Sequence, residues 1–340
     1  MAVTIGINGF GRIGRYLVRL LASDDTLRIG AINARADNAS LAHLFKYDSS
    51  HGTFRGAVDY NDDGLIINGK HIPVTRNKVG EWRWKELGVS LAVETSGTIK
   101  DRAGLAQHLT CGARKVVISA PCKDADLTVV MGVNQEMYEG GRHDVVSAAS
   151  CTTNCLAPVA KTLHDAFGIR HGLMTTIHSY TMSQRILDGS HKDLRRARAA
   201  CVSMIPTTTG AAKATALVIP SLKGKLDGMA VRVPTPNVSL VDFTCELEKA
   251  CDTAQVNATI KAAAEGALKD NMGYSEEPLV SVDYEGSTYG GVVDAMSTMV
   301  IDQHLAKVII WYDNEAGFTN QLVRLLQMVG KDCCRSPAGV

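Results

Sequence analysis

Two different spacings of apolar residues divide the chain. In the first part, residues 3–7 form a short apolar run, and apolar side chains then recur at helical spacing over residues 12–22. A second apolar run at residues 27–33 completes a strand–helix–strand unit. Further strands are expected at residues 54–60, 65–67, 71–75, 90–94 and 115–118, with Asn68-Gly69 as a hairpin turn. This part of the chain therefore predicts an α/β domain.

The second part of the chain has longer runs in which apolar and polar residues alternate. These runs lie at residues 173–179, 229–233, 238–247 and 307–312, with helical spacing at 210–217, 253–268 and 315–330. Alternation indicates strands with one buried face, so we expect an α+β domain with a mostly antiparallel sheet. Residues 180–205 are polar and basic with little periodicity. They predict a long loop, which is either a solvated surface or part of a site.

Length and composition narrow the classes of function. With 340 residues, 45% of them hydrophobic, the chain has room for two domains with separate cores. A net charge of +1 provides no basic field for nucleic acid. The nine cysteines show no CxxC pair, so we expect neither disulfides nor a metal site, and a reducing, cytoplasmic location. No apolar run approaches the ~20 residues that a membrane-spanning helix needs, and we expect no membrane anchor.

A glycine-rich turn follows the first predicted strand. Gly9-Phe10-Gly11-Arg12-Ile13-Gly14 matches the pattern GxGxxG and opens the first predicted helix. The motif alone also fits a structural turn, but its place between a strand and a helix indicates a Rossmann-type dinucleotide site. The acidic residue that usually binds the ribose hydroxyls at the end of the second strand is absent. The chain reads Asn33-Ala34-Arg35 at that point.

A cysteine at a predicted helix start is the candidate nucleophile. The chain reads Ser150-Cys151-Thr152-Thr153-Asn154-Cys155, with Ser150 as the expected N-cap. Free N–H groups and the helix dipole favour the thiolate in the first helical turn, so we expect a lowered pKa for Cys151. The alternative is a buried, inert cysteine. The hydroxyl and amide neighbours argue against that alternative for Cys151, whereas we accept it for Cys155.

These motifs occur with others in a fixed order along the chain. They are Thr175-Thr176-Ile177-His178-Ser179-Tyr180-Thr181, Arg232-Val233-Pro234-Thr235-Pro236-Asn237-Val238 and Trp311-Tyr312-Asp313-Asn314-Glu315. Together with the glycine-rich turn they span nearly the whole chain, which resembles the phosphorylating glyceraldehyde-3-phosphate dehydrogenase family. The resemblance implies a dinucleotide-binding domain of residues 1–150 and 315–340 and a catalytic domain of residues 151–314. It also implies a homotetramer in which the loop 180–205 lines the neighbouring subunit's coenzyme site.

The resemblance also implies roles for individual residues. Cys151 would attack an aldehyde to give a thiohemiacetal, and His178 would activate the thiol and accept a proton as hydride leaves. The resulting acyl thioester would pass to inorganic phosphate. The implied ligands are Ser150, Thr152, Thr209 and Gly210 for the attacking phosphate, and Thr181, Arg196 and Arg232 for the phosphate of a phosphorylated aldehyde. Arginine suits this role because its planar fork binds phosphate oxygens in pairs.

The coenzyme contacts implied by the resemblance lie in both parts of the chain. They are Gly9, Gly11, Arg12, Ile13, Asn33, Ala34, Arg35, Thr95, Ser96, Gly97, Ser119, Ser190 and Asn314, with either Arg76 or Lys78 on the adenine side. Relatives that use NAD carry Asp in place of Ala34, and its carboxylate repels a 2′-phosphate. Ser190 stands where NAD-specific bacterial relatives carry Pro, and Arg35 adds a positive charge. We therefore expect NADP to be favoured, with NAD as the alternative if these changes are neutral and Arg35 faces solvent.

Two further positions depart from the family pattern. Ala149 stands where Asn is usual, and Ile99 stands where a Phe lies beside the adenine. The nearest rival function is erythrose-4-phosphate dehydrogenase, and arsenate is the rival acceptor because it shares the charge and shape of phosphate. A Cys/His hydrolase or acyltransferase is a rival of another class, against which the GxGxxG motif argues. A binding protein without catalysis is a third, against which the intact Cys151, His178 and Arg232 argue.

Overall fold

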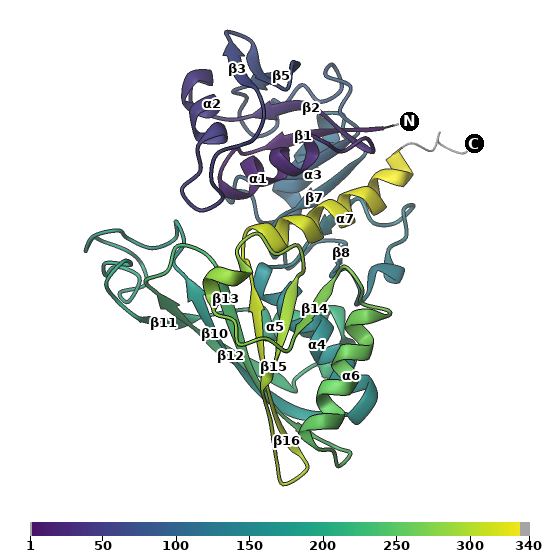
Figure 1. The fold of residues 1–340 in the computed structure, drawn as a ribbon. Helices are drawn as coiled ribbons and strands as arrows, with labels where there is room; N and C mark the ends of the chain where they lie inside the picture. Colours follow the sequence, from purple (N-terminus) through teal and green to yellow (C-terminus); the bar gives the residue numbers. More distant parts are fainter. Residues whose placement is uncertain (1, 334–340) are drawn as a thin grey trace. The chain divides into compact units, whose positions relative to one another are not determined.

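The computed structural model describes residues 2–333, which form two compact units (Figure 1). The first unit contains the chain up to Val129, Glu136–Ala149 and the chain from Leu322. The second unit contains Val130–Gln135 and Ser150–Gln321. The first unit is therefore discontinuous in sequence, and the helix α7 (Ala316–Cys333) carries the chain into it.

The first unit is built on a nine-stranded sheet of order β3-β4-β5-β2-β1-β6-β7-β9-β8. Its strands are β1 (Val3–Asn8), β2 (Leu27–Asn33), β3 (Val58–Asn61), β4 (Gly64–Ile67), β5 (Lys70–Thr75), β6 (Leu91–Glu94), β7 (Lys115–Ile118), β8 (Leu127–Thr128) and β9 (Val145–Ser147). Its further helices are α1 (Arg12–Leu21), α2 (Asn38–Lys46) and α3 (Arg102–Thr110). The neighbouring pairs from β5 through β8 are parallel, which confirms the predicted Rossmann-type domain.

Parallel pairing explains why the strands of this unit are buried and why the loops after them gather at one edge of the sheet. All six residues of β1 are buried, as expected for a strand covered on both faces. Trp82 and Trp84 lie in the adjoining core cluster, and the ring of Trp82 stacks on that of His108 at 3.7 Å between centroids. Because parallel strands end at the same edge, the carboxyl ends of β1, β2, β6 and β7 bring their following loops together.

Two details of the first unit test the predictions from the sequence. The hairpin at Asn68-Gly69 is confirmed, since both residues have positive φ and Ile67 pairs with Lys70. The strand expected from residue 54 begins only at Val58. Phe54 instead packs its ring on another phenylalanine, and a Cβ at Gly56 would lie 2.3 Å from Oδ1 of Asn68. The close approach of Asn68 therefore requires glycine at position 56, and the expected strand is shorter at its start.

The helices α2 and α3 were absent from the prediction, although the sequence carries a signal for each. Asp37 caps α2 by accepting a hydrogen bond from the N–H of Ser40, and Asp101 caps α3 by accepting one from Gly104. An aspartate at the N-cap is a recognised helix start. Their apolar periodicity is weak, so apolar spacing alone does not predict these two helices.

The second unit is built on a seven-stranded sheet of order β11-β12-β10-β13-β16-β15-β14. Its strands are β10 (Ile169–Ser179), β11 (Ile205–Thr208), β12 (Leu226–Val233), β13 (Ser239–Leu247), β14 (Met272–Ser275), β15 (Gly291–Ile301) and β16 (Leu305–Tyr312). Its helices are α4 (Cys151–Phe167), α5 (Ala211–Val218) and α6 (Thr253–Glu265), which pack on one side of the sheet (Figure 1). Four of the six neighbouring pairs are antiparallel, which confirms the predicted α+β domain.

Large apolar side chains remain exposed on the second unit. Leu173 on β10 is 67% exposed and Ile301 on β15 is 64% exposed. No named helix or strand of the structure lies between Ser179 and Ile205, where the long loop was expected. The exposed apolar side chains of this loop are Met182, Ile186, Leu187, Leu194, Val202 and Met204.

Trp311 on β16 is not among these exposed side chains, since its ring stacks on that of Tyr284 with 5.4 Å between the centroids.

Candidate active site

The helix α4 begins at Cys151. Ser150 is its N-cap, and the Ser150 hydroxyl accepts a hydrogen bond from the N–H of Thr153 at 3.1 Å. The N–H groups of Cys151 and Thr152, in the same first turn, have no partner within the helix. They point toward the N-terminal end of α4, where the thiol lies. The sequence thus produces a helix start with a thiol at its first position.

His178 lies beside this thiol. It is near the end of β10, is buried, and places Nε2 3.6 Å from Sγ of Cys151. Burial raises the pKa of Cys151, while the positive charge of Arg232 acts in the opposite direction. Burial and then Arg232 lower the pKa of His178 to about 3. The expectation of a lowered pKa for the thiol is therefore wrong for this arrangement, because desolvation outweighs the helix terminus and the neighbouring charge.

Arg232 contacts the other side of the imidazole. It is paired with His178 in the parallel register of β10 and β12, and its Nη1 lies 2.7 Å from Nδ1 of His178. The same Nη1 donates to the carbonyl of Ser179 at 2.9 Å. Nε of Arg232 is buried without a hydrogen-bond partner among the described residues. Cys151, His178 and Arg232 thus form one contiguous group.

Tyr312 is a member of the site that the sequence reasoning missed. Its hydroxyl lies 2.9 Å from Oγ1 of Thr152 and 2.8 Å from Oγ1 of Thr176. Thr176 donates its own proton to the carbonyl of Leu240, so Tyr312 must donate to Thr176 and Thr152 must donate to Tyr312. The proton of the Thr152 hydroxyl is therefore already engaged. If Thr152 donates to a phosphate, its backbone N–H is the available group.

The residue before the N-cap has an unusual backbone. Ala149 is fully buried and has a φ of 58°, in the left-handed region that alanine rarely adopts. The sequence pattern already singled out this position, because Asn is usual there in the family and Asn tolerates that region better. The strain occurs two residues before Cys151, where the chain turns into α4.

Three of the expected phosphate ligands have other partners in this structure. Nε of Arg196 donates to Oγ1 of Thr207 on β11 at 2.9 Å, and burial, helped by the positive charge of Arg196, lowers the pKa of Arg232. Thr209 accepts a hydrogen bond from the N–H of Ala211, directly before α5, where Gly210 is the N-cap. Thr181 instead contacts Ser183 and Gln184. The hydrogen bonds in the structure thus connect Arg232 to the Cys–His pair, and they do not connect Thr181 to it.

Asn314 is held by a serine that the sequence did not single out. Oγ of Ser239 accepts from the N–H of Ser179 at 3.1 Å and donates to Oδ1 of Asn314 at 2.9 Å. A backbone N–H can only donate, so the proton of Ser239 must point to Asn314. This fixes the amide of Asn314 with its Nδ2 group on the other side, free to meet a carbonyl oxygen.

The glycine-rich turn of the first unit fits a dinucleotide. Gly9 has a φ of 102°, and a Cβ there would lie 2.5 Å from the backbone of Ser96. A Cβ on Gly14 would lie 2.3 Å from the carbonyl of Gly9. A Cβ on Gly11, the N-cap of α1, would meet no atom within 4 Å. Two glycines are thus needed for the turn and its packing, and the third leaves open space at a helix N-terminus, where a pyrophosphate binds in such folds.

Several expected coenzyme contacts hold this edge of the sheet together. Asn33 makes all of its side-chain bonds internally, to Asn8, Asn77 and Thr75, and so positions the strand ends and has no group left for a ribose. Thr95 donates to the carbonyl of Gly9 at 2.7 Å. The other polar side chains in this set also have partners within the unit: Arg12 bonds to Asp48, Ser96 to Thr98, and Ser119 to the carbonyl of Glu94. Ile13 and Gly97 have no polar side chain.

The region after β2 is where the two coenzymes would differ. Ala34 is buried and donates its N–H to the carbonyl of Thr75, whereas Arg35 is exposed. Nη2 of Arg76 donates to the carbonyl of Ala36 at 2.7 Å, which brings this guanidinium beside the end of β2. Lys78 is exposed, as is Ser190 in the second unit, whose carbonyl accepts from Arg185. Ile99 belongs to the core cluster of the first unit.

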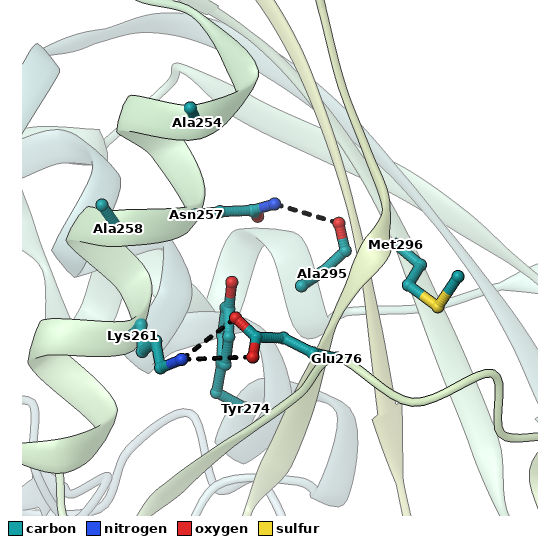
Figure 2. Close-up of a pocket in the computed structure, with 8 residues that line it drawn as sticks. All are labelled: Ala254, Asn257, Ala258, Lys261, Tyr274, Glu276, Ala295 and Met296. Carbon is teal, nitrogen blue, oxygen red and sulfur yellow. Dashed lines mark hydrogen bonds and ion pairs between the residues drawn. The ribbon is translucent and has the colours of Figure 1, made fainter.

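A surface hollow elsewhere on the second unit lacks comparable chemistry. It has a volume of about 430 Å³ and is lined by Ala254, Asn257, Ala258, Lys261, Tyr274, Glu276, Ala295 and Met296 (Figure 2). Lys261 forms an ion pair with Glu276 at 3.0 Å, and Asn257 donates to the carbonyl of Ala295. The lining thus contains no nucleophile paired with a base, unlike the group around Cys151.

Residues 2–333 carry neither a metal-ligand cluster nor a membrane-spanning helix. No set of three or more His, Cys, Asp and Glu side chains is arranged there to ligate a metal ion. None of the helices in this part of the chain is both long enough and apolar enough to span a membrane.

Comparison with known proteins agrees with both units. Residues 3–102 match the family model for the glyceraldehyde 3-phosphate dehydrogenase NAD binding domain, and residues 150–314 match that for the C-terminal domain. Glyceraldehyde-3-phosphate dehydrogenase of Geobacillus stearothermophilus is 57% identical over 96% of this chain and 97% of its own. The enzyme of the same name from Priestia megaterium is 54% identical, covering 97% of this chain and 98% of its own. Glyceraldehyde-3-phosphate dehydrogenase 1 of Bacillus subtilis is 53% identical over 97% and 99%. The chain belongs to the glyceraldehyde-3-phosphate dehydrogenase family.

Proposed function

We propose that the protein oxidises D-glyceraldehyde 3-phosphate and phosphorylates it to 1,3-bisphosphoglycerate. The observation that carries this proposal is the Cys151–His178 pair, with Sγ and Nε2 3.6 Å apart and Arg232 on the same imidazole. A thiol and a base at this separation suit nucleophilic attack on a carbonyl. A half-buried arginine beside them suits an anionic group on the same substrate. The names of the relatives support the choice of substrate.

The chemistry follows from the groups around the thiol. Cys151 attacks the aldehyde carbon, and the backbone N–H of Cys151 stabilises the developing oxyanion. Nε2 of His178 takes the hydroxyl proton of the thiohemiacetal as the aldehyde carbon is oxidised. A nicotinamide coenzyme supplies the hydride acceptor when it is bound. The product on the protein is an acyl thioester of Cys151.

The thioester then needs an acceptor held close to it. We assign inorganic phosphate to the hydroxyls of Ser150 and Thr209 and to the backbone N–H groups of Thr152 and Gly210, because the first turns of α4 and α5 present unpaired N–H groups. Arg232, Arg196 and Thr181 are assigned to the phosphate of the substrate. Phosphate attack releases the thiol of Cys151 and yields the acyl phosphate.

The coenzyme is assigned as NADP, with NAD as the alternative. Ala34 leaves no carboxylate at the end of β2, so a 2′-phosphate would meet no negative charge from that position. Arg35, in the loop after β2, and Arg76, directly after β5, both add positive charge near this position, and Arg76 is already held beside Ala36. Asp37 does not oppose this assignment directly, because its carboxylate is turned onto the N–H and hydroxyl of Ser40. Asn314, oriented by Ser239, would bind the nicotinamide carboxamide.

A homotetramer in the cytoplasm completes the proposal. The exposed apolar side chains on the loop 180–205 and on β10 and β15 suit burial against further copies of the chain. The eight cysteines within residues 2–333 are free, which supports a reducing compartment. Sedimentation of the purified protein would test the tetramer directly.

The deciding experiment measures initial rates with glyceraldehyde 3-phosphate while each coenzyme and each acceptor is varied. We expect reduction of NADP at least as efficient as that of NAD, and dependence on phosphate, with arsenate as a substitute acceptor. Faster turnover of erythrose 4-phosphate without any acceptor would favour the rival dehydrogenase. Thioester hydrolysis without coenzyme reduction would favour the hydrolase.

A further inference from the structure

A buried carboxyl group lies at the end of β6 in the first unit. Glu94 is the last residue of that strand and is 1% exposed. Its Oε1 accepts a hydrogen bond from the N–H of Ser96 at 2.7 Å, and its Oε2 accepts one from Nδ2 of Asn8 at 2.6 Å. Nε2 of His108 lies 3.3 Å from the same Oε2. A carboxyl group buried this deeply needs partners for both oxygens, so the direction of each bond matters.

The direction of the Asn8 bond follows from a backbone group further along the network. The N–H of Asn77 can only donate, and it donates to Oδ1 of Asn33 at 2.8 Å. Nδ2 of Asn33 therefore donates to Oδ1 of Asn8 at 2.8 Å, which leaves Nδ2 of Asn8 to donate to Glu94. The end of β2 is thus connected through the end of β1 to this carboxyl group.

The indole of Trp84 determines the role of His108. An indole N–H can only donate, and Nε1 of Trp84 donates to Nδ1 of His108 at 3.0 Å. Nδ1 therefore carries no proton, and the neutral ring has its proton on Nε2, which faces Glu94. Ser96, Asn8 and His108 are thus all donors, and none of them can accept a proton from a carboxylic acid. Glu94 is therefore a carboxylate surrounded by neutral donors.

Ser96 packs directly against the glycine-rich turn. A Cβ at Gly9 would lie 2.5 Å from the backbone nitrogen of Ser96, and Thr95 donates to the carbonyl of Gly9 at 2.7 Å. The backbone carbonyl of Glu94 accepts from both the N–H and the hydroxyl of Ser119, directly after β7. Glu94 therefore contacts or connects the loops at the carboxyl ends of β1, β2, β6 and β7.

We propose that Glu94 is a positioning residue for the coenzyme, because its carboxylate fixes the N–H of Ser96 and keeps residues 95–97 in the geometry that receives a dinucleotide. The inference rests on the proposed function only in taking a nicotinamide dinucleotide as the ligand. A buried negative charge does not attract a pyrophosphate, so the contribution of Glu94 to binding comes from geometry. A site that already has its binding geometry loses less conformational entropy when the ligand binds.

Glu94→Gln separates the roles of the two carboxylate oxygens. With its amide oxygen in the place of Oε2, glutamine keeps the bonds from Asn8 and His108, but its NH₂ group then faces the N–H of Ser96. The opposite orientation would place the NH₂ group against two donors, so the bond to Ser96 is the one lost. We expect the Kd of the full-length protein for NADP and for NAD, measured by titration calorimetry, to rise about tenfold, as for one hydrogen bond to a charged group.

Trp82→Phe is the matched control. The ring of Trp82 stacks on that of His108, but its Nε1 has no hydrogen-bond partner among the described residues. Both variants should unfold at a lower urea concentration than wild type, because each disturbs the same core, but only Glu94→Gln should weaken coenzyme binding. An equal rise in Kd in the two variants, or an unchanged Kd in Glu94→Gln, would overturn the inference.

Hydrogen exchange at the Ser96 amide reports on the same bond in the absence of coenzyme. In wild type this amide should be protected before any coenzyme is added. Glu94→Gln should lose that protection while the amides of β6 keep theirs. Protection that develops in wild type only after NADP or NAD is added would refute the proposed role, and this measurement needs no variant to fold.

Turnover of glyceraldehyde 3-phosphate separates this inference from the proposed function. A protein whose coenzyme binding depends on Glu94 but which does not oxidise the aldehyde would contradict the assigned reaction and support the inference. An active enzyme whose coenzyme Kd does not depend on Glu94 would contradict the inference alone.

Discussion

The hydroxyl of Ser239 donates to Oδ1 of Asn314 at 2.9 Å and thereby fixes which end of that amide faces away from β13. If Asn314 holds the nicotinamide carboxamide, loss of this bond lets the amide turn. We predict that Ser239→Ala raises the KM for the coenzyme about tenfold, as expected from one neutral hydrogen bond, with a smaller change in the KM for the aldehyde. Ser239→Thr, which keeps the hydroxyl, is the control. Equal coenzyme KM values in Ser239→Ala and wild type would contradict the role.

Substitution of Cys151 and substitution of His178 should impair catalysis at different steps. Cys151→Ser should give no burst of reduced coenzyme in the absence of phosphate, because no thioester forms. His178→Asn should lower kcat by about 10² to 10⁴, the usual range for loss of a general base. Cys155→Ala, one turn further along α4, is the matched control and should keep the burst. A burst in Cys151→Ser would assign the nucleophile elsewhere.

The pKa of His178 predicts how stability depends on pH. The unfolded chain binds a proton at His178 near pH 6.5, whereas burial lowers the folded pKa to about 3. Between these values the unfolded state holds more protons, so the free energy of unfolding falls as the pH falls, by up to about 1.4 kcal/mol per pH unit. Urea denaturation from pH 6.5 to pH 4.5 measures it. His178→Asn should reduce the slope, and the same substitution at the exposed His71 should not. Identical slopes in wild type and His178→Asn would refute the prediction.

The backbone of Ala149 predicts a stabilising substitution. Glycine adopts a φ of 58° without the Cβ strain that costs alanine about 1–2 kcal/mol. Ala149→Gly should therefore raise the free energy of unfolding by about 0.5–1 kcal/mol after the greater chain entropy of glycine is included. Ala148→Gly, at the neighbouring buried position without positive φ, should lower it instead. The same sign for both variants would show that strain at Ala149 is not the cause.

The end of β2 predicts a change in coenzyme preference. Ala34→Asp places a carboxylate where it accepts bonds from ribose hydroxyls and repels a 2′-phosphate. We predict a shift in kcat/KM toward NAD of at least tenfold, about 1.4 kcal/mol. Ala36→Asp adds the same charge to the exposed part of this loop and should shift the ratio less. A wild-type preference for NAD above about tenfold would contradict the assignment of NADP.

The sequence predicted those features of the fold that local rules determine. The strands β2 and β7 begin and end at the expected residues, and the turn at Asn68 follows from its turn chemistry. Capped helices with weak periodicity, such as α2, need the cap itself as a signal. Periodicity does not predict how strands are paired in space, so the contact between His178 and Arg232 emerged only from the register of β10 and β12.

The site shows the same division between local and long-range information. The cysteine at the start of α4 is a local feature that the sequence identified. The bond between Thr152 and Tyr312 joins residues 160 positions apart, and no pattern near either one indicates it. The direction of the Cys151 pKa also depends on burial by distant segments, and so the helix terminus alone gave the wrong sign.

The three tryptophans of the chain are divided between the two units, so intrinsic fluorescence can report on each unit separately. Trp82 and Trp84 lie in the core of the first unit beside His108, whereas Trp311 packs on Tyr284 in the second. Fluorescence of Trp311→Phe would therefore come from the first unit alone. Fluorescence of the double variant Trp82→Phe, Trp84→Phe would come from the second. Melting curves from the two variants would reveal whether the units unfold together or one after the other.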